Sequence, residues 1–255
     1  MSNAKFIKNV ACVKCRENGK DKHGDNFATY SDGSGYCWNC GYTRLSDNAI
    51  SEFLSKGKCC IPATPPLITT PFDCCLDYPK KSIDWINKYT LTLSDMLNNG
   101  VLWSESEQRL IFPLWNNDVL LGWQGRYFGI DKDKKKWYGK GYLQEVYHIL
   151  FNGKVGQASN DAKQLVLTED IISAIKVSKL GIPAMPLFGV NIKSRWKLLR
   201  ILRYQEVIIF LDPDMHTKSL LQSKEGVLQG VRNRCILSTK DPKEYSYDEL
   251  KEILK

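Results

Sequence analysis

The sequence contains no long apolar run and no signal for secretion. Nowhere do about 18 apolar residues follow one another, so no segment is long enough for a membrane-spanning helix. The N-terminal residues MSNAKFIKNVAC lack the apolar core of a signal peptide, which argues against secretion. The P-loop pattern GxxxxGK followed by Ser or Thr is also absent, which excludes a P-loop ATPase in this chain.

The composition is that of a globular protein with an excess of basic residues. The 255 residues are 43% apolar and 25% charged, which is enough for a hydrophobic core in one large domain or two smaller ones. The formal net charge of +8 favours a polyanionic partner, because a basic surface attracts phosphates. Ordinary solubility charge explains the same excess equally well, so such a partner needs support from specific motifs.

Four of the nine cysteines form two closely spaced pairs. Cys12 and Cys15 make one CxxC unit, and Cys37 and Cys40 make another after 21 intervening residues. Each unit supplies two thiolates from one tight turn, and two units complete the tetrahedral ligand set of a structural Zn²⁺. A strand-like stretch at 27–30, followed by a turn, lies between them. This pattern predicts a small β-module of the zinc-ribbon type.

The other five cysteines follow no chelating pattern. An odd total argues against a complete disulfide framework in a chain that is not secreted. Adjacent Cys-Cys pairs chelate metals poorly, so we interpret these five cysteines as buried or incidental thiols. A second metal site is the alternative. These residues are Cys59, Cys60, Cys74, Cys75 and Cys235.

Composition and periodicity divide the chain into four parts. Four prolines between 61 and 71 favour an extended linker. Helical periodicity follows, with Thr92 as a helix cap, and then a predicted antiparallel pair of strands at 109–115 and 119–127. Further on, strands alternate with helices, which predicts an α/β layer fold with a parallel sheet. The expected protein is multidomain, combining α+β and α/β parts: a zinc ribbon (1–46), a proline-rich linker (47–80), a basic α+β subdomain (81–160) and an α/β subdomain (161–255).

Acidic side chains follow three of the predicted strands in the last part. Glu169 comes directly after one strand, Asp212 and Asp214 follow a second, and Asp241 lies shortly after a third. Parallel strands end at one edge of their sheet, and four carboxylates gathered there repel one another without a cation such as Mg²⁺. For each motif alone, ordinary Asp-Pro turn chemistry is the alternative. The three strands are predicted at 165–168, 207–211 and 235–238.

The order of these motifs resembles that of bacterial and phage DNA primases. Thr168-Glu169, the FLDPD stretch at 210–214 and the KDP stretch at 240–242 are similar to the glutamate, the DxD pair and the later aspartate of a TOPRIM domain. The stretch 109–115 followed by 122–126 is similar to the motif of the primases' basic subdomain, an Arg-hydrophobic-Phe-Pro segment and then GxxxR. With the zinc ribbon upstream, the chain looks most like the primase half of phage primase-helicases.

The resemblance implies synthesis of short RNA primers on a single-stranded DNA template from ribonucleoside triphosphates. Residues 81–160 and 161–255 would be the basic and TOPRIM subdomains of the RNA polymerase core. Glu169 would be the catalytic carboxylate, Asp212 and Asp214 would hold the catalytic Mg²⁺ or Mn²⁺, and Asp241 would support that site. The resemblance also implies a separate replicative helicase and a DNA polymerase as partners, no membrane, and a cytoplasmic location, in the bacterial host if the chain is phage-encoded.

Basic and aromatic residues are the expected contacts to nucleotides and DNA. Arg126 lies in the GxxxR stretch, so the resemblance implies that it binds phosphates. Four lysines follow in a basic stretch, for which a solvated loop is the alternative. Two ribbon aromatics would stack on unpaired bases, or else form the small core of the ribbon. These residues are Lys134, Lys135, Lys136, Lys140, Tyr36 and Trp38.

Two positions depart from the primase pattern. Ser173 stands where many primases carry a further acid, with Asp170 nearby but expected to point elsewhere, and Ser34 stands where some phage primases have a histidine. The first departure favours an alternative, a catalytically inactive protein that binds single-stranded DNA, although the intact acidic set weighs against it. A TOPRIM nuclease would not explain the ribbon, and a topoisomerase needs a strand-passage domain for which this length leaves no room.

Overall fold

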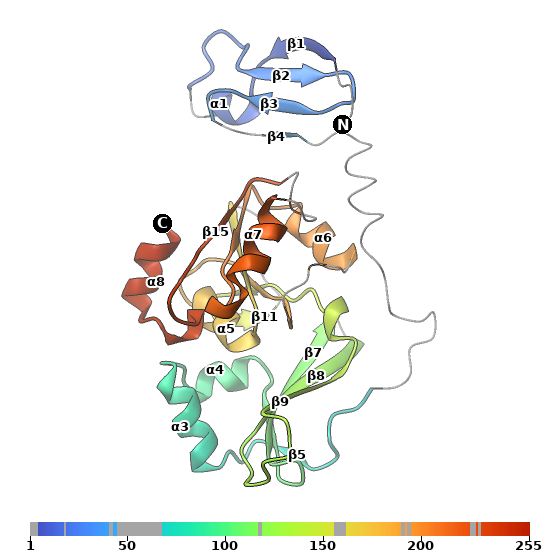
Figure 1. The fold of residues 1–255 in the computed structure, drawn as a ribbon, viewed down its shortest axis with the longest axis vertical. Coiled ribbons are helices and arrows are strands. Elements are labelled where there is room, and N and C mark those ends of the chain that lie inside the picture. Colours follow the sequence, from blue (N-terminus) through green and yellow to red (C-terminus); the bar gives the residue numbers. More distant parts are fainter. Residues whose placement is uncertain are drawn as a thin grey trace.

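The computed structural model arranges the chain in three sheets (Figure 1). Most of the predicted linker, including Cys59 and Cys60, lies outside the described residues. The three sheets belong, in chain order, to the ribbon, the basic subdomain and the α/β subdomain. The described residues are 5–17, 19–40, 43–44, 68–116, 119–155, 162–189, 192, 195–224, 228 and 231–255.

The N-terminal sheet is an antiparallel ribbon of four strands. Asp32 closes the turn between its second and third strands, since its Oδ1 accepts hydrogen bonds from the N–H and the hydroxyl of Ser34 (3.0 and 2.6 Å). Gly35 is required on the third strand, because a Cβ there would collide with the ring of Phe27 on the paired strand. The predicted ribbon is therefore confirmed. Its elements are β1 (Phe6–Val10), α1 (Val13–Glu17), β2 (Phe27–Tyr30), β3 (Gly35–Cys37) and β4 (Thr43–Arg44), with the strands in the order β1-β2-β3-β4.

The middle sheet is antiparallel throughout, and two short helices lie between its first and second strands along the chain. The predicted pair of long strands is confirmed, with Ile111 opposite Gly125. The predicted helix cap is also confirmed: Thr92 Oγ1 accepts from the N–H of Asp95 (3.3 Å), and Asp95 Oδ2 accepts from the N–H of Thr92 (2.7 Å). The elements are β5 (Cys74–Cys75), α3 (Lys80–Lys88), α4 (Leu93–Asn98), β6 (Leu102–Ser104), β7 (Arg109–Asn116), β8 (Val119–Tyr127) and β9 (Trp137–Gly141), with the strands in the order β5-β6-β7-β8-β9.

The third sheet has four parallel strands, extended at one side by an antiparallel pair. Its order is β11-β10-β13-β12-β14-β15. The strand predicted at 235–238 begins and ends earlier, because β14 offers its last partner at Ile209, whose carbonyl accepts from the N–H of Ile236 (2.9 Å). The strands are β10 (Leu150–Phe151), β11 (Lys154–Val155), β12 (Gln164–Thr168), β13 (Ala184–Pro186), β14 (Glu206–Ile209) and β15 (Asn233–Cys235).

Helices and short 3₁₀ turns connect the strands of this sheet. None of the described helices is long and apolar enough to cross a membrane. The elements are η1 (Leu143–Glu145), α5 (Ile171–Ser178), α6 (Arg195–Ile201), η2 (Pro213–Met215), α7 (His216–Lys224), η3 (Pro242–Glu244) and α8 (Tyr247–Leu254).

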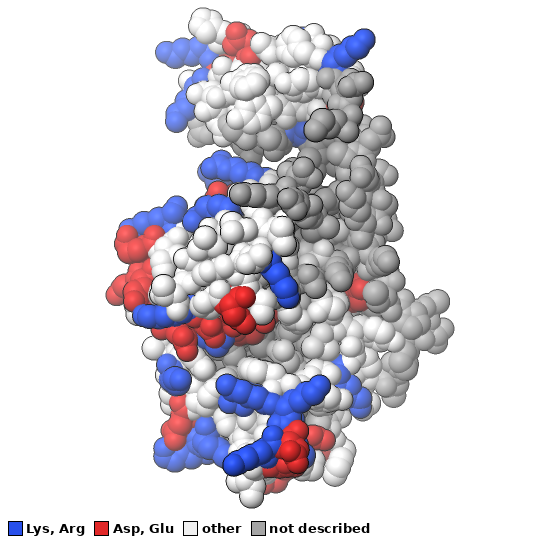
Figure 2. Space-filling view, viewed as in Figure 1, with Lys and Arg blue, Asp and Glu red and all other residues white. Residues whose placement is uncertain are grey.

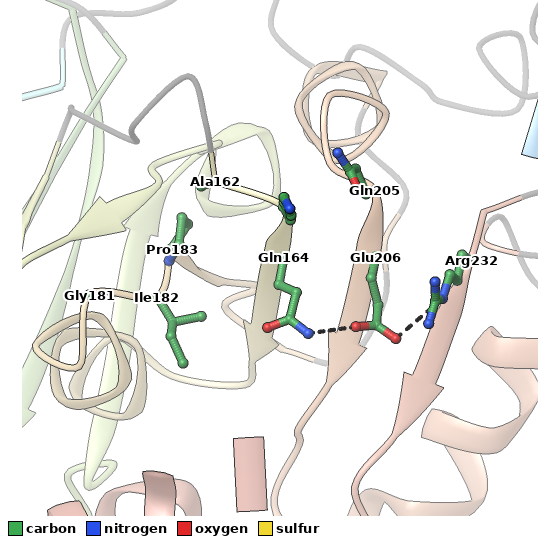
Figure 3. A pocket seen from close by; sticks show the side chains of 9 residues that line it. Ala162, Gln164, Gly181, Ile182, Pro183, Gln205, Glu206 and Arg232 are labelled. Atoms are coloured by element: carbon green, nitrogen blue, oxygen red, sulfur yellow. Dashed lines mark hydrogen bonds and ion pairs between the residues drawn. The ribbon is translucent and has the colours of Figure 1, made fainter. Parts of the chain in front are cut away.

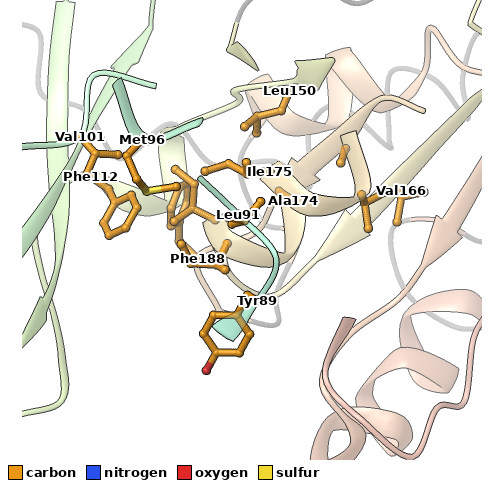
Figure 4. Close-up of a cluster of buried hydrophobic side chains, with 14 of the residues drawn as sticks. Tyr89, Leu91, Met96, Val101, Phe112, Leu150, Val166, Ala174, Ile175 and Phe188 are labelled. Carbon is orange, nitrogen blue, oxygen red and sulfur yellow. The ribbon is translucent and has the colours of Figure 1, made fainter. Parts of the chain in front are cut away.

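One hydrophobic cluster joins the basic subdomain to the α/β subdomain. Met96 and Phe112 from the first pack in the same cluster as Val166 and Ile175 from the second (Figure 4). The neighbouring strand residues Leu165 and Leu167 instead belong to a cluster on the other face of the parallel sheet. Strand β12 is thus buried on both faces, as strands of a parallel sheet covered on two sides are. The two subdomains therefore share a hydrophobic core.

Candidate functional site

The four predicted zinc ligands converge at one end of the ribbon. Ligand atoms of Cys12, Cys15, Cys37 and Cys40 all lie within 4.8 Å of one another, and three of these side chains are buried. Two sulfur pairs, Cys12–Cys40 and Cys15–Cys37, are 3.6 Å apart. Burial raises the pKa of the Cys15 thiol to about 12. Burial also acts to raise the pKa of Cys37, but hydrogen bonds from the backbone N–H groups of Cys40 and Asn39 outweigh it and lower that pKa to about 7. Four sulfurs in this arrangement fit a structural Zn²⁺.

Two side chains, one between the CxxC units and one within the second unit, hold the first unit in position. Asp21 Oδ2 accepts a hydrogen bond from the N–H of Cys12 (2.5 Å), and its Oδ1 accepts from the N–H of Gly24 (2.9 Å). Asn39 donates to the Sγ of Cys15 (3.5 Å). Sequence reasoning missed both side chains, because a single Asp or Asn in a loop has no pattern that separates bracing from ordinary turn formation.

The other described cysteines do not form a second thiol cluster. Cys74 and Cys75 are half-buried on the edge strand β5, and Cys235 donates to the carbonyl of Ser219 (3.2 Å). Among the described residues, the group of four ribbon cysteines is the one that satisfies metal-ligand spacing. The alternative of a second metal site thus has no support within the described part of the chain.

The two ribbon aromatics lie outside the small buried cluster of the ribbon. Tyr36 is half-buried and Trp38 is 70% exposed, with their rings edge to face at 4.8 Å. Phe27, not either of them, packs with the buried cysteines. An exposed aromatic pair beside a metal-braced turn is a suitable platform for an unpaired base.

The predicted acidic residues gather at the carboxyl edge of the parallel sheet. Glu169 follows β12, Asp212 follows β14, Asp214 lies in η2, and Asp241 directly precedes η3. Burial, followed by the charges of Asp214 and Asp170, raises the pKa of Glu169. Burial together with the charges of neighbouring acids, partly offset by a nearby lysine, raises the pKa of Asp212 to about 7. These carboxyl groups are therefore close enough to repel one another.

A lysine that sequence reasoning did not single out lies among these acids. Lys243 Nζ is 2.6 Å from Asp241 Oδ2, 2.9 Å from Asp170 Oδ2 and 3.6 Å from Asp212 Oδ2. The expectation that Asp170 points elsewhere is wrong: the residue caps helix α5, and the cap directs its carboxylate toward the acidic group. Among the described residues, no three carboxylates bring oxygens within 4.8 Å of one another as the cysteines do.

Two carboxylate oxygens at this edge remain available for a cation. Glu169 Oε2 and Asp212 Oδ1 are buried, and neither has a hydrogen-bond partner in the part of the chain that the structure describes. A buried carboxylate oxygen without a donor is costly unless a cation or a solvent molecule satisfies it. The donor set, oxygens only, fits Mg²⁺ or Mn²⁺.

The predicted phosphate-binding residues lie on and beside the connection from β8 to β9. The guanidinium of Arg126 packs beside the rings of Trp85 and Phe128 (5.4 and 5.2 Å to their centroids) and donates to the carbonyl of Tyr127 (2.7 Å). This side chain is thus engaged within the protein. The buried Arg109 donates to the carbonyl of Lys135 (3.0 Å), which anchors the backbone of the connection. The four lysines project into solvent: Lys134, Lys135, Lys136 and Lys140.

Charged side chains of both signs cover the face drawn in Figure 2. Lys and Arg side chains are prominent at the lower end of the molecule, where α3 and β9 lie in Figure 1, with several Asp and Glu side chains among them. Many Asp and Glu side chains lie on the α/β part above it, again beside Lys and Arg.

A pocket of about 460 Å³ lies at the opposite edge of the parallel sheet. It opens where β12 and β14 begin, so the sheet separates it from the acidic residues (Figure 3). Glu206 at its rim accepts a hydrogen bond from Gln164 (2.6 Å) and pairs with Arg232 (3.5 Å). These polar groups satisfy one another, so the pocket is not the candidate site.

Comparisons with known proteins support the predicted fold. No protein-family model matches the sequence, and no curated protein matches it. The crystal structure of the Aquifex aeolicus primase, comprising zinc-binding and RNA polymerase domains, is similar with a TM-score of 0.54 and 13% identity, covering 99% of this chain and 80% of that one. The primase fragment of the bacteriophage T7 primase-helicase matches at 0.47 with 15% identity over 98% of both chains. A DNA primase domain from Pseudomonas aeruginosa matches at 0.46 with 19% identity, over 64% of this chain and 58% of that one.

The likeness to the Aquifex structure shows a shared fold along nearly the whole chain. The chain therefore has the multidomain architecture of a prokaryotic-type primase, with a four-cysteine ribbon, an α+β subdomain and an α/β subdomain. At 13% identity the likeness does not extend to activity.

Proposed function

We propose that this protein is a DNA primase that makes short RNA primers on single-stranded DNA. The observation that carries the proposal is a pair of buried carboxylate oxygens at the carboxyl edge of the sheet, from Glu169 and Asp212, which have no hydrogen-bond partner among the described residues. Ligand sites of open α/β sheets lie at that edge. The primase fold around it makes nucleotidyl transfer the reaction that best fits an acidic, cation-binding site.

In the proposed reaction, the 3′-hydroxyl of the growing primer attacks the α-phosphate of a ribonucleoside triphosphate. A new phosphodiester bond forms, the bond to the β-phosphate breaks, and pyrophosphate leaves. Asp212 and Asp214 hold the divalent cation, and Asp241 supports them. Mg²⁺ or Mn²⁺ bound there would neutralise the charge that develops on the phosphate oxygens. Glu169, whose pKa burial raises, is suited to accept the proton of the attacking hydroxyl.

The other candidate residues have supporting roles in this proposal. The exposed lysines of the β8–β9 connection attract the phosphates of template and nucleotide, while Arg126 holds the connection in shape and adds the positive charge of its guanidinium. Tyr36 and Trp38 stack on template bases, and Zn²⁺ keeps their strand folded. A separate replicative helicase and a DNA polymerase, in the cytoplasm, are the proposed partners.

The test is template-dependent RNA synthesis by the full chain and by Asp212→Asn. With single-stranded DNA, labelled ribonucleotides and Mg²⁺, the wild-type chain should yield short RNA. Asp212→Asn should lower the rate at least about a hundredfold, because it removes a cation ligand at the reacting phosphate. Asp248→Asn is the matched control, since that carboxylate lies on α8 with a side chain that is 94% exposed. Undiminished synthesis by Asp212→Asn would contradict the site.

One observation favours a second candidate, an inactive protein that binds single-stranded DNA. Lys243 partly neutralises the acidic edge, so three of its carboxylates already have a cation. If the wild-type chain binds single-stranded DNA but makes no RNA with Mg²⁺, with Mn²⁺ or with a helicase added, this second function is the correct one.

A further inference from the structure

Lys243 is surrounded by carboxylates in the way that a bound metal ion would be. Its ammonium nitrogen lies 2.6 Å from Asp241 Oδ2, 2.9 Å from Asp170 Oδ2 and 3.6 Å from Asp212 Oδ2. Its side chain is 13% exposed, so little water competes for the ammonium group. A compact cation with three carboxylate neighbours from separate segments is placed as a divalent cation would be.

The surrounding structure holds this lysine in place. The buried Lys176 on α5 donates to the main-chain carbonyl of Lys243 (2.8 Å). Asp170 caps the same helix, and its Oδ2 accepts from both the hydroxyl of Ser173 (3.0 Å) and the ammonium of Lys243. Ser173 therefore orients the carboxylate of Asp170, to which Lys243 donates. The serine at 173, where many primases carry an acid, thus has a structural role. Lys243 is thus a fixed part of the edge, not a surface side chain that folds over it.

Asp212 lies between this ammonium group and the oxygens that are still available. Its Oδ2 faces Lys243, while its Oδ1 is buried without a partner among the described residues, as is Glu169 Oε2. In sites with two metal ions, one carboxylate commonly lies between two cations a few ångströms apart. Here one of the two cation positions beside Asp212 is already filled by the side chain of Lys243.

We propose that Lys243 takes the place of a second divalent cation, so that the acidic edge binds one divalent cation where it would otherwise bind two. This inference rests on the proposed function, because it concerns the same edge. The single positive charge of the ammonium group offsets one of the two negative charges of Asp170 and Asp241, whatever the metal concentration. Its fixed positive charge also opposes a dication brought next to it, so it limits the affinity of the remaining position.

The test is to count bound Mn²⁺ in the zinc-saturated full chain, using the electron paramagnetic resonance signal of free Mn²⁺. Wild type should bind one equivalent. Lys243→Met, which keeps the length of the side chain and removes the charge, should bind two, the first at least about tenfold more tightly. Lys243→Arg keeps the charge and should bind one. Lys240→Met is the matched control, because Lys240 lies three residues away and pairs with Glu249 (3.4 Å).

Two results would overturn the inference: two equivalents bound by wild type, or wild-type number and affinity in Lys243→Met. Circular dichroism checks that the variant is folded; if it is not, the counts for wild type and Lys243→Arg decide alone. RNA synthesis is scored separately. A chain that makes no RNA while wild type binds one Mn²⁺ and Lys243→Met binds two supports the inference and refutes the proposed function. RNA synthesis with unchanged Mn²⁺ binding in Lys243→Met does the reverse.

Discussion

Replacing Cys37 by serine should weaken Zn²⁺ binding, lower the zinc content and destabilise the ribbon while the rest of the chain stays folded. Cys37 is fully buried, and its sulfur lies 3.6 Å from that of Cys15. The described ribbon has its own sheet and its own buried cluster, and that cluster consists of Phe27 with three of the cysteines. The two larger hydrophobic clusters contain no residue of the ribbon. Loss of the metal should therefore act locally.

The magnitudes show that the metal, not the apolar core, stabilises this module. Burying one phenylalanine contributes about 1.5–3 kcal/mol, whereas a structural Zn²⁺ contributes about 10–16 kcal/mol at neutral pH. If each of the four thiolates supplies roughly a quarter of that binding free energy, losing Cys37 costs about 2.5–4 kcal/mol. This corresponds to zinc affinity weaker by a factor of roughly several hundred. The apolar contacts of Phe27 are too small to replace it.

Two measurements check this prediction. Competition with a chromogenic chelator gives the zinc affinity of Cys37→Ser, and hydrogen exchange gives the protection of β2 and β3 relative to β12 and β14. Cys74→Ser is the control, since Cys74 is half-buried on another sheet. The variant should also start primers more poorly than it extends a supplied primer. Wild-type zinc affinity in Cys37→Ser, or protected β2 and β3 amides after zinc removal, would refute the reasoning.

Three further predictions concern the shared core. Phe112→Ala should destabilise the chain by about 3–5 kcal/mol in urea unfolding, because the ring is 1% exposed between the two subdomains; a loss below about 1 kcal/mol would place the ring outside the shared core. Burial, with a small contribution from a nearby lysine, lowers the pKa of His148 to about 4. Between pH 6.5 and 4 the unfolded chain therefore takes up a proton that the folded chain does not, so wild type should lose up to about 3 kcal/mol of stability as the pH falls through this window. His148→Phe should lose less over the same range, and equal losses would mean that His148 is protonated in the folded state. Asp95→Asn breaks the 2.7 Å ion pair to Lys179 that links the subdomains, and it weakens a helix cap. The urea midpoint should therefore fall by the equivalent of about 2 kcal/mol. Asp84→Asn, which breaks an exposed ion pair, should change it by less than about 0.5 kcal/mol.

Much of the fold could be predicted because it depends on patterns local to the sequence. The two CxxC units specify a four-sulfur site from spacing alone, since each knuckle is a single tight turn. The strand pair with Ile111 opposite Gly125 follows from two apolar stretches separated by turn residues. Glu169 directly after the strand that became β12 predicts the edge at which the acids gather.

The remaining features depend on contacts between distant segments, which no local pattern encodes. The sequence by itself determined the metal-braced ribbon, the succession of strands and helices along the chain and the acidic residues at the strand ends. Each of these rests on local patterns of residues. Only the tertiary structure decided that Arg126 packs against two aromatic rings, that the two subdomains share one core, and that Lys243 lies against Asp170 across 73 positions of sequence. Packing of α5 against η3 brings these last two together, and packing is a property of the whole folded chain.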